Sequence, residues 1–202
     1  LDPGSGGGKT HAGGGAIRID LTGALIVNGN ITANGQGSSY WNDGASSGGG
    51  IHITCHSVSG TGTVAANGGS NGTYGGGGGG RVAVHYDAAA QASTACSVRF
   101  EARGGLSVDS MNYPGSPGSL YFTDNQFFTS PDYLAGGWKF AGVLHSGAGL
   151  PSLVVNGSVL LDRAWMVFPE PGFTLNVTGD LTITGLYTHV YGLFLATNGH
   201  VG

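Results

Sequence analysis

The sequence predicts an all-β fold, a single right-handed parallel β-helix (a solenoid) with glycine-rich loops along one edge. Three observations lead to this prediction. The composition is poor in helix formers, a similar unit recurs at a spacing of 31 to 36 residues, and apolar and polar residues alternate inside each unit.

The composition separates this chain from most classes of protein. Glycine accounts for 42 of 202 residues, and charged residues for 9%, against usual shares of about 7% and about 25%. The good helix formers Glu, Lys, Gln, Met and Arg number only 14, which argues against a helical protein. Glycine does not recur at every third position, which excludes collagen. The regular alternation of apolar residues favours a folded chain over a disordered one.

Three consecutive segments share one plan. Each has a glycine run, an alternating strand, and a second short strand that leads into a glycine-containing turn. Alternation places every second residue on one face of a strand, and equivalent faces of successive units can stack. The predicted stacked sets are Ile17, Ile51 and Val82; Ile19, Ile53 and Val84; Leu21, Cys55 and Tyr86; Ile31, Val64 and Phe100; and Ala33, Ala66 and Ala102.

Glycine and asparagine mark the corners between these strands. Asn-Gly pairs tolerate positive φ and predict tight turns. The hexaglycine at 75–80 precedes Val82 as glycine triplets precede Ile17 and Ile51. We therefore expect a stacked edge held by backbone hydrogen bonds there, rather than a flexible linker.

The repeat pattern divides the chain into three parts. Residues 1–110 carry the glycine-rich coils. Residues 111–149 form a connector with aromatic clusters, expected to continue the solenoid. Residues 150–202 carry plainer coils spaced by about 20 residues, and the turn signature at 196–199 resembles an unfinished repeat. The sequence thus predicts one solenoid, truncated at this end and lacking the polar caps that isolated solenoids need.

The segments GGGAIRIDLTGALIVNGNITANG, GGGIHITCHSVSGTGTVAANGG and GGGGGGRVAVHYD resemble the glycine-rich, pectin-lyase-like β-helical repeat regions of large secreted or cell-surface proteins. The resemblance covers roughly residues 4–105 and, as generic coils, 150–185. It implies a parallel β-helix, an extracellular location and an adhesin-like or structural role, and it brings no catalytic motif. The sequons at Asn30, Asn71, Asn156 and Asn176 are possible N-glycosylation sites in a eukaryotic source.

Charge and hydropathy exclude two classes of partner. The net charge is −4 with only seven Lys and Arg, so no basic surface for nucleic acid is expected. No apolar run approaches the roughly 18 residues of a membrane helix, so we expect no membrane insertion.

Two short motifs match nucleotide or hydrolase signatures only in part. Gly8-Lys9-Thr10 resembles the end of a phosphate-binding loop, but Pro3 occupies the position of its first glycine. The two G-x-S-x-G matches, at 44–48 and 68–72, lack the strand-turn-helix context of a nucleophile elbow. Neither motif predicts an activity.

Polysaccharide cleavage would need carboxylates or basic groups gathered on one face. The alternation places Asp20 and His85 on the outward face with His52 and Thr54, as single residues in each coil. We interpret them as solvated outer-face residues and expect no enzyme, with a polysaccharide lyase or hydrolase as an alternative. The candidates for that alternative are Asp20, His85, Asp87, Arg99, Glu101 and Arg103.

Metal and disulfide chemistry have weak support. His52 and His56 lie on one side of a strand but about 13 Å apart, too far to share an ion. We expect no metal and no cofactor. The alternation of its strand directs Cys55 inward, so we expect it to act as a small core residue. A disulfide between Cys55 and Cys96 is possible.

Aromatic residues in the glycine loops suggest glycan binding. Tyr40, Trp41, Tyr74 and Tyr113 follow equivalent strands, so stacked coils would align their rings along one edge. Exposed rings beside Asn and Ser suit the apolar faces of neutral sugars. The alternative is that these rings cover and pin their own loops.

The sequence as a whole predicts a structural role. We expect a building block of an extracellular surface or filament assembly, because open solenoid ends expose unpaired strand edges that can pair with another chain. The expected partner is another copy of the chain, or the rest of a longer chain. A glycan-binding adhesin module and a polysaccharide-degrading enzyme are the alternatives.

Overall fold

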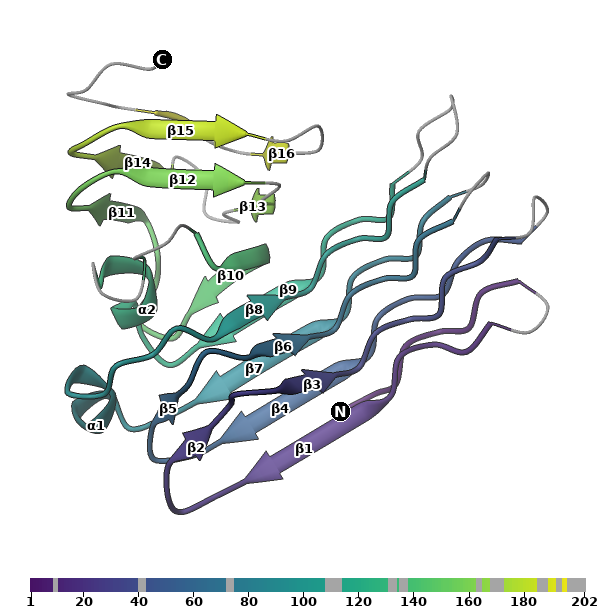
Figure 1. Ribbon diagram of the computed structural model, residues 1–202, viewed down its shortest axis with the longest axis horizontal. Helices are drawn as coiled ribbons and strands as arrows, with labels where there is room; N and C mark the ends of the chain where they lie inside the picture. The colour runs from purple at the N-terminus through teal and green to yellow at the C-terminus, as the bar shows by residue number, and fades with distance from the viewer. Residues whose placement is uncertain are drawn as a thin grey trace.

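The computed structural model describes residues 1–8, 11–39, 43–71, 75–107, 114–130, 134, 138–162, 165–167, 173–184, 189–191 and 194–195. Its main element is one curled, open sheet whose strand pairs are all parallel (Figure 1). The spatial order is β1 (Ala16–Asp20), β4 (Gly50–Thr54), β7 (Arg81–His85), β9 (Ser119–Phe122), β10 (Phe140–Ser146), β8 (Arg99–Glu101), β6 (Thr63–Ala65) and β3 (Asn30–Thr32).

Strand β10 joins the two halves of this sheet. Its first residues, Phe140 and Ala141, pair with β8, and its later residues, from Val143 to Ser146, pair with β9. Gly142 stands between the two paired parts with a φ of +155°. The strands on both sides thus join through β10 into one half-barrel, which stays open between β1 and β3. The prediction of a right-handed parallel β-helix solenoid is therefore wrong.

Within the half-barrel, the predicted register of the repeats is confirmed. Ile17 pairs with Ile51 and Ile51 with Val82, while Ile31 pairs with Val64 and Val64 with Phe100. β9 and β10, from the aromatic connector, continue the same sheet. The repeat thus specifies which residues stack, although it does not specify the closure.

Smaller parallel sheets accompany the half-barrel. β2 (Leu25–Ile26) pairs with β5 (Val58–Ser59), and β12 (Val159–Asp162) with β15 (Leu181–Thr184). β14 (Thr174–Val177) lies between β11 (Ser152–Val155) and β17 (Phe194–Leu195). β13 (Trp165–Val167) and β16 (His189–Tyr191) extend the main sheet beside β10 to ten strands.

The glycine-rich segments form long arms that project from one side of the sheet (Figure 1). Backbone hydrogen bonds hold each arm together and join it to the next; Gly80 N donates to Ala66 O at 2.7 Å and Gly79 N to Ser116 O at 2.8 Å. A Cβ built on Gly80 would lie 2.0 Å from Gly49 O. The expectation of a stacked, hydrogen-bonded edge at 75–80 is confirmed.

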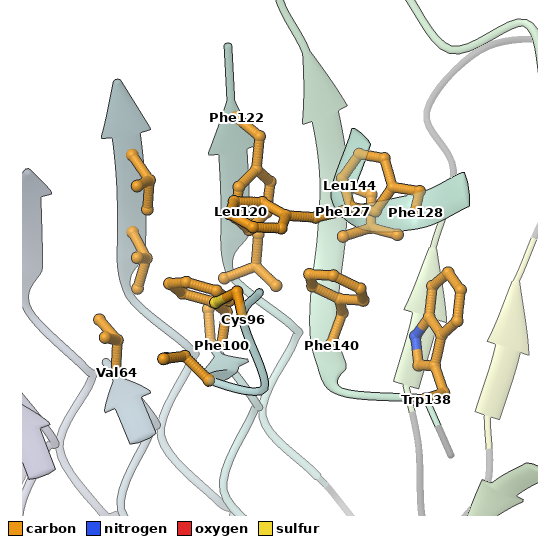
Figure 2. Packing of buried hydrophobic residues seen from close by; sticks show 14 of the residues in the cluster. Val64, Cys96, Phe100, Leu120, Phe122, Phe127, Phe128, Trp138, Phe140 and Leu144 are labelled. Atoms are coloured by element: carbon orange, nitrogen blue, oxygen red, sulfur yellow. The ribbon is translucent and has the colours of Figure 1, made fainter. Parts of the chain in front are cut away.

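At the other end of the repeats, aromatic rings fill the concave side of the sheet (Figure 2). Phe100 and Phe122 are fully buried, with ring centroids 5.0 Å apart, and Phe140 lies 5.5 Å from Phe122. Two short helices close this core, α1 (Ala88–Ala92) and α2 (Gln126–Thr129). The repeat pattern does not predict α1, although its alanine-rich run follows Asp87, whose carboxylate accepts from Ala90 N at 2.8 Å.

Candidate functional site

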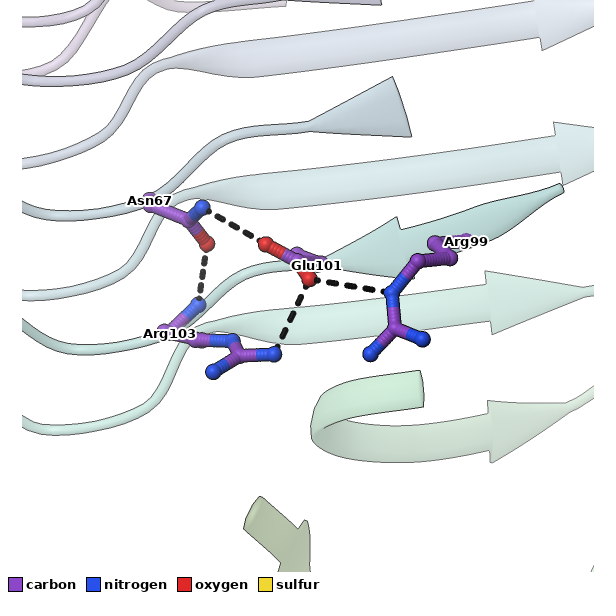
Figure 3. A network of polar contacts seen from close by, with 4 residues as sticks. All are labelled: Asn67, Arg99, Glu101 and Arg103. Carbon is purple, nitrogen blue, oxygen red and sulfur yellow. Dashed lines mark hydrogen bonds and ion pairs between the residues drawn. The ribbon is translucent and has the colours of Figure 1, made fainter. Parts of the chain in front are cut away.

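Charged side chains converge on the outer face of β8 (Figure 3). Glu101 accepts from Arg103 Nη2 at 2.9 Å and from Asn67 Nδ2 at 3.0 Å, and Arg99 Nε lies 3.6 Å from the same carboxylate. Asn67 Oδ1 in turn accepts from the backbone N–H of Arg103 at 2.8 Å. This Glu101 cluster ties the base of one glycine arm to the base of the next.

Asparagine continues this pattern toward the open edge. Asn34 Oδ1 accepts from Asn67 N at 2.7 Å. This bond is equivalent to the one between Asn67 and Arg103, but it lies one stacked repeat, or layer, earlier in the chain. Burial lowers the pKa of Lys139, and the nearby Arg99 lowers it further. The Glu101 carboxylate is already engaged by several donors, so the arrangement is suited to structural bridging.

A second polar group crosses the outer face of β1, β4, β7 and β9. The ring centroids of His52 and His85 are 5.0 Å apart, and those of His85 and Tyr121 are 5.1 Å apart. Burial lowers the pKa of His85, and the charge of neighbouring His52 lowers it further. At the edge of this row Asp20 binds Arg18 Nε at 2.6 Å, a hydrogen bond that lowers the pKa of the Asp20 carboxyl.

A groove of about 580 Å³ lies beside this row. Glycine backbone from the starts of the strands forms its floor, and Arg81, Ser119 and His145 are on its sides. The floor N–H groups of Gly49 and Gly80 already donate to Ala33 and Ala66. The groove therefore presents few free backbone donors to a ligand.

The structure separates the residues considered for polysaccharide cleavage. Asp20 and His85 lie on the β1 and β7 side of the sheet, and Glu101 lies with its arginines on β8. Asp87 instead caps α1. Ser46, from the first G-x-S-x-G match, is fully buried and accepts from Gly7 N at 2.8 Å. Among the described residues, the candidates Asp20, Asp87 and Glu101 lie on separate elements and do not form the pair of facing carboxyl groups that glycoside cleavage requires.

Metal ligands and cysteines are equally dispersed. In the described part of the chain, no three His, Cys, Asp or Glu side chains group closely enough to hold an ion. Cys55 and Cys96 are both buried free thiols, so the possible disulfide between them is not formed. Burial raises the pKa of Cys96 to about 11 and also raises that of Cys55.

The remaining predictions concern glycan-stacking aromatic residues, N-glycosylation sites and membrane insertion. The candidate glycan-stacking residues Tyr40, Trp41, Tyr74 and Tyr113 lie outside the described residues. Asn30, Asn156 and Asn176 are exposed. Asn71 is only 2% exposed, and its amide nitrogen donates to Asp43 O, so glycosylation there would require this contact to open. None of the described helices is long and apolar enough to cross a membrane.

The open edge of the half-barrel leaves apolar side chains of β1 and β3 partly exposed. Ile17, Ile19 and Ile31 of β1 and β3 point into the core but remain partly exposed, whereas Ile51, Ile53 and Val64 of the next layer are at most 1% exposed. Nearby Ile26 is 67% exposed and Leu21 39%. The alternation pattern predicted which residues face inward, and no described strand pairs with the outer edge of β1 or β3.

Comparison with known proteins adds no relative: no family model, curated protein or solved structure matches this chain. The resemblance to glycine-rich repeat regions of surface proteins therefore rests on the sequence alone.

Proposed function

We propose that this protein is a structural building block of an extracellular surface or filament assembly, and that it pairs with a second copy of itself through the open edge of its main sheet. The observation that carries the proposal is the contrast between the first two layers. Side chains in equivalent positions are buried in β4 and β6 and partly exposed in β1 and β3.

The backbone of β1 presents unpaired groups along the same edge. Leu21 N donates to Thr54 O at 2.8 Å, and Gly15 O accepts from Gly50 N at 3.1 Å. Because successive residues of a parallel strand direct their backbone groups to opposite sides, Ala16, Arg18 and Asp20 turn theirs away from β4. A row of free N–H and C=O groups beside half-exposed isoleucines is a template for another strand.

The repeat pattern favours a copy of this chain as the occupant. The layer that covers β1 within the molecule, β4, places an isoleucine opposite Ile17 and another opposite Ile19. A second copy carries strands with this same alternation. Two half-barrels joined edge to edge would make a two-fold interface, the commonest arrangement of homo-oligomers. Burial of the exposed isoleucines would then stabilise the pair.

Arg18→Pro tests the proposal with little disturbance inside the chain. Proline removes an N–H that faces the open side, and an edge strand tolerates it there. Light scattering should give the wild type a mass of at least twice 20.2 kDa and Arg18→Pro the mass of a monomer. Arg18→Ala is the matched control, since it removes the same side chain but keeps the N–H, and it should remain associated.

A wild-type monomer at every accessible concentration would overturn the proposal, and so would Arg18→Pro that associates as the wild type does. Electron microscopy of the associated form would then distinguish discrete pairs from longer filaments. Extracellular location is part of the same proposal, and antibody labelling of intact cells tests it separately. The low charge of the chain and its exposed sequons support that part.

A further inference from the structure

We propose that His52 and His85 form a binding site for one divalent transition-metal ion, such as Zn²⁺, on the outer face of the main sheet. The two side chains come from neighbouring strands, β4 and β7. The proposal goes beyond the assembly function, and it uses a face of the sheet that is separate from the open edge.

The register of the sheet brings these two histidines together. His52 pairs with Ala83, and Thr54 pairs with His85, so the histidines are diagonal neighbours. The small side chain of Ala83 leaves room for the rings to approach to a centroid distance of 5.0 Å. Two imidazoles on one tetrahedral zinc, with Zn–N bonds of about 2.0–2.1 Å, have centroids about 5 Å apart. The observed spacing therefore fits a shared ion.

One ring nitrogen of the pair lacks a partner within the protein, which also suits a metal. Nδ1 of His52 is buried and has no hydrogen-bond partner. A buried polar atom of this kind carries an energetic cost that a bound ion or its water shell can relieve.

The surroundings define the coordination that we expect. The carboxylate of Asp20 lies near His52 and adds negative charge, but it is bound to Arg18 Nε at 2.6 Å. The ring of Tyr121, from β9, packs against His85 at a tilt of 38°. The protein thus supplies two imidazole nitrogens, and water completes the coordination shell.

Calorimetric titration of the full chain with zinc chloride at pH 7.5 tests this site. We expect one Zn²⁺ bound per chain, and at least tenfold weaker binding in His52→Ala and in His85→Ala. His56→Ala is the matched control, because His56 is an exposed histidine of the same segment with no histidine beside it among the described residues, and this variant should bind as the wild type does. Circular dichroism melting curves establish that the variants remain folded.

Absence of zinc binding by the wild type would overturn the proposal, as would unchanged binding by the His52→Ala/His85→Ala double variant. The same titration of Arg18→Pro separates this site from the assembly interface. Undiminished binding by a monomeric Arg18→Pro would support a site within one chain, whereas its loss would show that two copies contribute ligands and would contradict the site described here.

Discussion

The glycine arms and the aromatic core stack the same repeats by opposite means. In the arms, neighbouring layers meet backbone to backbone, and a Cβ on Gly77 would lie 1.9 Å from Ser46 O. In the core, the layers are separated by whole rings, such as Phe100 and Phe140. One register thus serves two kinds of packing, the first dependent on hydrogen bonds and the absence of side chains, the second on apolar burial.

This difference predicts how each region responds to substitution. The core should be sensitive to lost volume, because its stability comes from buried area and close packing. The arms should be sensitive to added volume, because backbone atoms cannot move aside as a flexible side chain can. Each half of this contrast can be tested against a control substitution at the equivalent position of another repeat.

The largest effect is expected for Phe100→Ala. Phe100 is fully buried and contacts Phe122, Phe127 and Phe140. Loss of the ring should lower the free energy of unfolding by about 3–5 kcal/mol, as measured by urea denaturation. Ile31→Ala is the control in the same ladder, and it should cost less because Ile31 is already partly exposed. Equal losses in the two variants would contradict the ranking of core over open edge.

An intermediate effect is expected for Gly80→Ala. The new methyl group would lie 2.0 Å from Gly49 O and 2.7 Å from Gly48 C, which are both backbone atoms. Such overpacking should cost about 1–3 kcal/mol.

Gly15→Ala is the control, because Gly15 occupies the equivalent position in the first repeat and a Cβ there meets no atom within 4 Å. It should leave stability within about 0.5 kcal/mol of the wild type. If Gly80→Ala were as stable as Gly15→Ala, the arms would not be stacked as closely as described.

The same contrast explains which features the sequence could predict. Equivalent residues such as Ile17, Ile51 and Val82 recur at a nearly fixed spacing, so their pairing follows from periodicity. The curling of the sheet depends on β10, which pairs with both β8 and β9 and lies in the connector, where the repeat is absent. The sequence alone therefore favoured separate coils, although the chain forms one curled sheet.

The candidate sites follow the same rule. The alternation pattern placed Asp20, His52 and His85 on one outward face. The close approach of the two histidines, however, arises because they are diagonal neighbours beside the small side chain of Ala83. Similarly, Glu101 and its arginines were identified one by one, whereas their link to Asn67 crosses between layers. The pairing of equivalent residues on neighbouring strands can be predicted from their spacing. Contacts between side chains that are not equivalent also depend on the rotamers that each side chain adopts.

The smallest predicted effect concerns pH, and it belongs to the core alone. Burial raises the pKa of Cys96 from an ordinary value near 9 to about 11, so the folded protein retains this proton where the unfolded chain has released it. The contribution of the thiol is complete below pH 9 and declines as the pH rises toward 11. At pH 10 it should lower the free energy of unfolding by about 1.4 kcal/mol relative to pH 7.

Cys96→Ala separates this thiol from the other titrating groups. Burial also raises the pKa of Cys55, and burial with the hydrogen bond to Asp124 raises that of Tyr86, so both act in the same direction. Urea denaturation at pH 7 and pH 10 should therefore show an alkaline loss that is reduced, but not removed, in Cys96→Ala. An identical loss in the variant and the wild type would mean that the thiol is already hydrated in the folded state. The core around Phe100 would then be less tightly closed than the arms.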